Sequence, residues 1–109
     1  MIQATIFQDS HKQACGIELR GHAGYSEYGQ DIVCAAVSAL ALNMANSVEA
    51  FTEDPFSGEV EEENGNFTFC FTGSVSRESR ILMDSLILGL KNIRESYGNE
   101  YISIHYREV

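Results

Sequence analysis

Apolar and polar residues alternate along five short segments of the chain, and this period of two is typical of strands that bury one face. The apolar positions of the five segments are Ile2, Ala4 and Ile6; Cys15, Ile17 and Leu19; Phe56 and Val60; Phe67, Phe69 and Phe71; and Ile102, Ile104 and Tyr106. Residues 63–66, which include Asn64 and Gly65, are suited to a hairpin turn between the third and fourth segments. The pattern therefore predicts five strands.

Two longer segments repeat their apolar residues at intervals of three and four, which is typical of helices with one buried face. The first, at about 31–51, opens with Asp31, whose carboxylate can cap the N–H groups of a helix start. The second runs from Ser76, a further N-cap, to Tyr97, just before Gly98. The expected buried positions are Val33, Val37, Leu40, Met44, Val48 and Phe51 in the first helix, and Leu82, Leu86, Leu90, Ile93 and Tyr97 in the second.

The order of these elements is ββαββαβ, which predicts an α+β fold of two layers, with two helices packed on one mixed sheet of about five strands. We expect residues 1–109 to form a single domain, because the sequence contains no repeat, linker or low-complexity tract. Its 44% hydrophobic and 21% charged residues are ordinary for a globular protein and exclude a disordered chain. No apolar run reaches the roughly 18 residues that span a bilayer, so no transmembrane helix is expected.

Charge and cysteine content narrow the choice of partners. Seven Lys and Arg stand against sixteen Asp and Glu, giving a formal net charge of -9. This balance disfavours direct binding to nucleic acid or to an anionic membrane, and favours a basic protein partner.

The N-terminal segment has the pattern of a strand and not of a signal peptide, and the three widely spaced cysteines give no disulfide framework or CxxC motif. We therefore expect a cytoplasmic protein.

The segment 21–31, between the second strand and the first helix, does not have the pattern of packed structure. It holds three glycines, two tyrosines and His22. Ordering three glycines costs conformational entropy, so their presence indicates either a mobile loop or a backbone that must approach another group closely. Cys34 follows in the first turn of the helix, where the helix dipole and free N–H groups favour a thiolate, although Asp31 would oppose it. His22 could act as the base for this thiol, and the helix start could stabilise an oxyanion.

Other interpretations of these residues remain open. A lone cysteine on an apolar helix is more often a small buried hydrophobe than a nucleophile. Tyr25 and Tyr28 either cover the loop or bind substrate side chains. His22, Cys34 and Asp31 could instead coordinate zinc, since three protein ligands suffice for a catalytic site, although the sequence has no closely spaced pair of ligands. Cys34, Ser38, Ala41 and Ala45 form a stripe of small side chains that would let another backbone approach closely.

Two linked sequence blocks resemble the ribosomal-processing cysteine protease family Prp. They are G-H-A-G-Y at 21–25 and G-Q-D-I-V-C-A-A-V-S-A-L-A at 29–41. The resemblance implies that Cys34 is the nucleophile and His22 the general base and acid, with Asp31 and Ser38 in supporting positions. No metal or cofactor is expected. We expect the glycine-rich loop at 21–31 to bind substrate. Its candidate residues are Gly21, Gly24, Tyr25, Tyr28 and Gly29.

The resemblance also implies a function. Members of the family are cytoplasmic, homodimeric endopeptidases that remove an N-terminal extension from the precursor of large-subunit ribosomal protein twenty-seven during ribosome assembly. Cleavage follows the second of two adjacent phenylalanines. Two alternatives from other classes stay open: a non-catalytic assembly factor that holds an immature ribosomal protein, and the zinc-site protein described above.

Overall fold

The strands and helices follow one another in the predicted order. In the computed structural model, residues 1–27, 30–61 and 65–109 are described. The elements are β1 (Ile2–Gln8), β2 (Ala14–Arg20), α1 (Ile32–Phe51), β3 (Phe56–Glu61), β4 (Asn66–Phe71), α2 (Arg77–Tyr97) and β5 (Ile102–Glu108). Asp31 and Ser76 cap the two helices as predicted, and Gly98 ends α2 with a φ of 114°.

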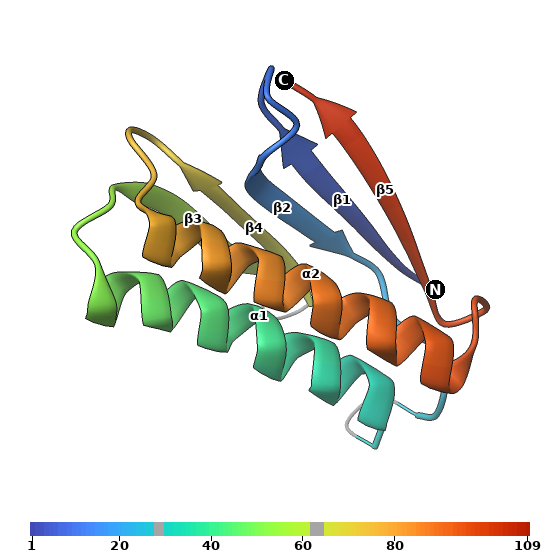
Figure 1. Ribbon diagram of the computed structural model, residues 1–109. Coiled ribbons are helices and arrows are strands. Elements are labelled where there is room, and N and C mark those ends of the chain that lie inside the picture. The colour runs from blue at the N-terminus through green and yellow to red at the C-terminus, as the bar shows by residue number, and fades with distance from the viewer. Residues whose placement is uncertain (28–29, 62–64) are drawn as a thin grey trace.

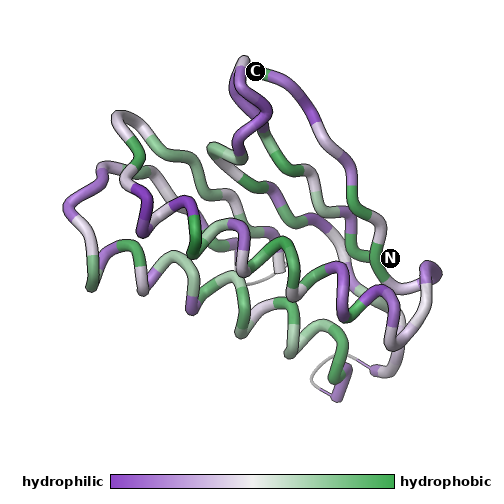
Figure 2. Tube along the Cα trace, viewed as in Figure 1, coloured by the Kyte–Doolittle hydropathy of each residue, from purple (hydrophilic) through white to green (hydrophobic). Residues whose placement is uncertain are grey.

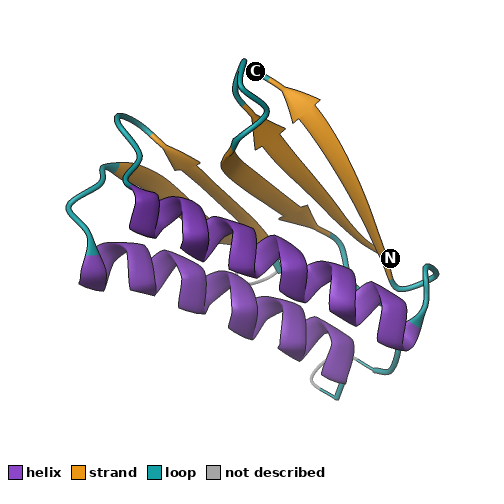
Figure 3. Cartoon of the chain, in the orientation of Figure 1, coloured by secondary structure: helices purple, strands orange, loops and turns teal. Residues whose placement is uncertain are grey.

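The five strands form one sheet in the order β3-β4-β2-β1-β5. Neighbouring strands run antiparallel except β1 and β5, which are parallel. Both helices lie side by side on one face of the sheet and run in opposite directions (Figures 1 and 3). This arrangement confirms the predicted α+β fold with two layers and a mixed sheet. β3 and β4 pair as the hairpin prediction requires, while residues 63 and 64 of the expected turn lie outside the described residues.

The core lies between the sheet and the helix layer, and the hydropathy along the chain follows it (Figure 2). The alternating positions of β1, β2 and β4 are buried there, as predicted. They are Ile2, Ala4, Ile6, Ile17, Leu19, Phe67 and Phe69. Cys15 differs from its expected inward position and is half-buried. A bulge shifts the β1–β2 register beside it, and its thiol donates to the Phe7 carbonyl at 3.5 Å.

Two expected core positions at helix ends are exposed. Phe51 is 76% exposed because it is the last residue of α1, and Tyr97, the last residue of α2, is 39% exposed. Along α2 the buried face is also rotated from the prediction, since Met83 and Ile87 are buried and Leu82 only partly so. The two helices approach closely where Leu40 of α1 meets Gly89 of α2. A β-carbon at Gly89 would lie 2.7 Å from Cδ1 of Leu40.

α1 is long and apolar enough to cross a membrane, judged by length and composition alone. No such segment was expected, because no uninterrupted apolar run in the sequence is long enough. The mean hydropathy of α1 is high although polar residues interrupt its apolar run. Val33, Met44 and Val48 are buried against the rest of the fold. These buried positions account for only part of its apolar composition, since 28% of the membrane-length window is buried.

Candidate active site

One carboxylate holds the 21–31 loop against the start of α1. Asp31 Oδ1 accepts hydrogen bonds from the N–H groups of Val33 at 2.9 Å and Cys34 at 3.0 Å. Its Oδ2 accepts from the N–H groups of Tyr25 at 3.0 Å and Ser26 at 3.4 Å. Asp31 is therefore both a helix cap and the link that fixes the loop relative to Cys34.

The environment of Asp31 favours its charged form. Burial opposes ionisation, but the N–H groups of Cys34, Tyr25 and Ser26 outweigh it, so the pKa of this carboxyl lies below its ordinary value. A carboxyl with a lowered folded pKa stabilises the fold above its unfolded pKa of about 3.9, and loses that contribution as the pH falls through the folded value. The Asp31 contribution is thus fully present at neutral pH.

Replacing Asp31 by alanine is expected to lower the free energy of unfolding at pH 7 by about 1–2 kcal/mol, since the cap and the loop hydrogen bonds are lost together. The difference from the unmodified protein should shrink below about pH 4. Urea unfolding followed by circular dichroism at pH 7 and pH 3 measures both effects. Asp31→Asn is the matched control, because it keeps an oxygen that can cap α1 and should cost less. Equal stability of the alanine variant at pH 7 would contradict this role.

Cys34 lies in the first turn of α1, where its sulfur meets the loop. The N–H of Ala23 donates to Cys34 Sγ at 3.1 Å, and the residue is half-buried. Burial is the main reason that the pKa of the Cys34 thiol is raised; the Ala23 N–H opposes this shift and the Asp31 carboxylate adds to it. Burial, with the nearby Asp31 carboxylate, thus opposes the thiolate that the helix start was expected to favour. The thiol needs a base to react.

His22 and Cys34 line the same cavity, of about 770 Å³. The exposed His22 lies on the strand side, where its ring is close to Gly65 before β4: a β-carbon at Gly65 would lie 3.5 Å from Cε1 of His22. The stripe of small side chains on α1 supplies part of the opposite wall through Cys34, Ser38 and Ala41. A base and a nucleophile from separate segments thus line one space, as expected of a Cys–His pair.

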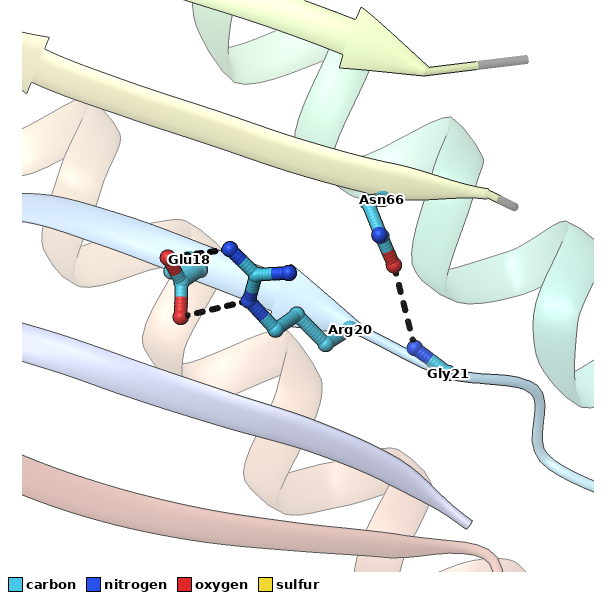
Figure 4. Close-up of polar contacts among 4 residues, drawn as sticks. All are labelled: Glu18, Arg20, Gly21 and Asn66. Atoms are coloured by element: carbon cyan, nitrogen blue, oxygen red, sulfur yellow. Dashed lines mark hydrogen bonds and ion pairs between the residues drawn. The ribbon is translucent and has the colours of Figure 1, made fainter. Parts of the chain in front are cut away.

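The loop is fixed at its beginning as well as at Asp31. The N–H of Gly21 donates to the side-chain oxygen of Asn66 on β4 at 3.3 Å, next to the Arg20–Glu18 ion pair of 2.9 Å (Figure 4). Gly21 has a φ of 86°, and a β-carbon there would lie 2.7 Å from the Met1 carbonyl oxygen. Both the left-handed backbone and the close approach require glycine. His22 therefore follows a position that only glycine fits.

The structure brings most of the predicted site residues to this cavity. Gly21, His22, Gly24, Asp31, Cys34 and Ser38 all line it. Tyr25 instead packs edge-on against Tyr97, with ring centroids 5.5 Å apart, and against Tyr101 at 5.2 Å. This contact favours the interpretation that Tyr25 covers and anchors the loop. Tyr28 and Gly29 lie outside the described residues.

Sequence reasoning missed the apolar walls of the cavity. Val60 of β3, Phe67 of β4 and Leu42 of α1 belong to them. Val60 and Leu42 are 49% and 43% exposed, so these large apolar side chains are open to a ligand. The sequence does contain one sign of this wall, since Val60 is an apolar residue among acidic ones on an edge strand. Its position at the cavity, however, depends on long-range strand pairing.

The described part of the chain contains no set of ligands for a zinc ion. Across residues 1–27, 30–61 and 65–109, no three His, Cys, Asp or Glu side chains gather closely enough to hold a metal ion. Asp31, one of the three proposed ligands, already accepts four backbone N–H groups. The cavity is therefore better suited to cysteine chemistry than to zinc.

Comparisons with known proteins agree with this chemistry. The model of a family described as cysteine protease Prp matches residues 1–103. The ribosomal processing cysteine protease Prp of Bacillus subtilis is 35% identical over 101 residues, covering 89% of this chain and 90% of the relative. Its counterpart from Staphylococcus aureus is 27% identical over 107 residues, covering 98% of this chain and 100% of the relative.

Solved structures show the same likeness. A crystal structure of S. aureus Prp with a covalently linked product peptide has a TM-score of 0.91 and 27% identity, covering 98% of this chain and 100% of that one. A second, with a substrate peptide, has a TM-score of 0.86 and 26% identity over the same shares of the two chains.

Proposed function

Because the chain belongs to the Prp family of cysteine proteases and is a cysteine-type peptidase, we propose that it processes a ribosomal protein precursor, using Cys34 as nucleophile and His22 as base. The observation that carries this proposal is the single cavity that both residues line. The related S. aureus protease has been crystallised with a substrate peptide and with a covalently linked product. A peptide substrate is therefore the class of ligand for this cavity.

The mechanism is acyl transfer. His22 removes the proton of the Cys34 thiol, and the sulfur attacks the scissile carbonyl. His22 then protonates the leaving amine, which departs as the C-terminal product, and water hydrolyses the thioester. Asp31 and Ser38 support this pair: Asp31 fixes the loop to α1, and Ser38 lies one turn beyond Cys34 in the same wall.

The negative charge of the tetrahedral intermediate needs a hydrogen-bond donor. Sequence reasoning gave this role to the first-turn N–H groups of α1, but those of Val33 and Cys34 donate to Asp31. The Ala23 N–H, which already donates to Cys34 Sγ at 3.1 Å, is the donor beside the reacting sulfur. We assign it to the oxyanion, so that the loop supplies the base and this donor together.

The substrate in this proposal is the precursor of large-subunit ribosomal protein twenty-seven, cut after the second of two phenylalanines. The apolar wall formed by Val60, Phe67 and Leu42 suits aromatic side chains. The formal net charge of -9 attracts the basic chain of a ribosomal protein. A cytoplasmic location and a homodimer complete the proposal.

A peptide that spans the paired phenylalanines tests the proposal. We expect cleavage after the second phenylalanine, identified by mass spectrometry of the products. A control peptide of equal length and charge, with both phenylalanines replaced by glycine, should be cleaved at least about tenfold more slowly, because two apolar contacts are lost. Equal cleavage of the two peptides, or cleavage elsewhere, would contradict the assigned specificity.

A further inference from the structure

A second cavity, of about 280 Å³, lies between the β1–β2 turn, the middle of α2 and the end of β5. It shares no lining residue with the cavity of His22 and Cys34. Ala14, at the start of β2, lines the second cavity, whereas Gly21, just after the end of β2, lines the first. The two cavities thus lie at opposite ends of β2.

The second cavity concentrates positive charge on an acidic protein. Lys12 from the turn and Arg80 and Lys91 from α2 line it, and these are three of the seven Lys and Arg of the sequence. Asp84 is the single carboxylate in the lining, so the formal charge of the site is +2.

These cations have no ion-pair partner in the described part of the chain. Across residues 1–27, 30–61 and 65–109, the one ion pair within 4 Å joins Arg20 and Glu18. Asp9 does not line the cavity; its carboxylate accepts the N–H groups of Gln13 at 3.1 Å and His11 at 2.8 Å, and these groups together with the charge of Arg80 lower its pKa. Three cations line the cavity with one carboxylate, so they repel one another, and a bound anion would reduce that repulsion.

Local structure sets the backbone of Lys12 and the ammonium group of Lys91 at the cavity. Lys12 has a φ of 59°, a left-handed backbone that is uncommon for lysine, and its N–H donates to the Asp9 carbonyl at 2.9 Å. Lys91 Nζ lies 5.7 Å from the centre of the Tyr106 ring. Arg80, Asp84, Ile87 and Lys91 follow one another at helical spacing along one face of α2.

We propose that this second cavity binds a small phosphate monoester. Such a group carries a charge of about -1.5 to -2 at neutral pH, which matches the +2 of the lining. The arginine supplies a planar donor pair for two phosphate oxygens, and the two lysines add point charges. Ala14, Ile87 and Tyr106 provide an apolar wall for the carbon part of the ligand. A carboxylate would leave half of this charge uncompensated.

Titration of the full chain with ribose 5-phosphate, inorganic phosphate and ribose, followed by isothermal calorimetry and by amide NMR, tests the proposal. Ribose 5-phosphate is expected to bind and to shift the signals of Gln8, Lys12 and Gln13, while ribose should not bind. Tighter binding of ribose 5-phosphate than of phosphate identifies the ester as the ligand. Equal affinity for ribose 5-phosphate and phosphate would identify the free anion as the ligand and would overturn the assignment of a phosphate monoester. Failure of both anions to bind at millimolar concentration would overturn the site itself.

Charge substitutions locate the binding. R80Q and K91Q should each weaken ribose 5-phosphate binding about tenfold or more, because a charge-assisted hydrogen bond is lost. R77Q is the matched control, since Arg77 is exposed on the same helix but does not line the cavity. Its affinity should stay within twofold of the unmodified protein. Equal weakening by R77Q and R80Q would show a general effect of charge and overturn the proposal.

Discussion

Replacing Cys34 by alanine is expected to abolish peptide cleavage, with a loss in kcat/KM of about 10⁴-fold or more. The sulfur is the atom that forms the covalent intermediate, and no other group in the cavity replaces it in the mechanism. Steady-state cleavage of the paired-phenylalanine peptide measures the effect. Thermal unfolding of the variant confirms that the fold is kept.

Two other thiols of the chain serve as matched controls. Cys15 and Cys70 are also free and half-buried, but neither lines the cavity of His22. Their alanine variants should retain cleavage within a few-fold. Cleavage by the Cys34→Ala protein at the unmodified rate would remove the nucleophile assignment. Normal function of Cys34→Ser in cells would favour the alternative of a non-catalytic assembly factor.

Replacing His22 by alanine is expected to lower kcat/KM at pH 7 by about 10²–10⁴-fold, the range for loss of a general base. Burial raises the pKa of the Cys34 thiol, so without His22 the thiol is almost entirely protonated at neutral pH. The rate of the variant should therefore rise with pH toward the pKa of the thiol itself, and the deficit should become smaller in alkaline solution.

The pH dependence of kcat/KM for the two proteins measures this difference. His105→Ala is the matched control, because His105 is exposed on β5 and its ring nitrogen contacts Ser103 Oγ at 3.2 Å, away from the cavity. It should leave the pH profile unchanged. A His22→Ala protein with the unmodified rate at pH 7, or with a deficit constant across pH, would contradict the role of base.

Local signals in the sequence were sufficient to predict the elements of the fold. Asp31 and Ser76 mark the starts of α1 and α2, because a short polar side chain satisfies N–H groups that a helix start leaves free. Alternation at Phe67 and Phe69 likewise identified the buried face of β4. These features depend on neighbours within a few residues, so a single sequence contains them.

Features that depend on long-range contacts were not predictable in the same way. The close approach of Leu40 on α1 to Gly89 on α2 and the cavity walls shared by α1, β3 and β4 both join segments far apart in the sequence. Tyr25 meets Tyr97 and Tyr101 only after the last third of the chain has folded onto the loop. Sequence spacing contains no information on these pairings.

The sequence predicted residues that line one cavity but not their electrostatics. The glycine-rich loop, the helix start and the family resemblance suggested a pair of His22 and Cys34, and Asp31 was expected to cap α1. The sequence did not show that the Asp31 carboxylate would accept hydrogen bonds from N–H groups of both the loop and the first helical turn. This double contact occupies the N–H groups of Val33 and Cys34, while burial is the main reason that the pKa of the Cys34 thiol is raised.

The most direct measurement is to stop the cleavage reaction with acid within its first turnover and to locate any bound fragment by peptide mass mapping. If the Cys34 sulfur attacks the scissile carbonyl, the N-terminal product will be found as a thioester on Cys34, and on neither Cys15 nor Cys70. Turnover of the same peptide without any fragment on Cys34, together with undiminished cleavage by Cys34→Ala, would contradict the assignment.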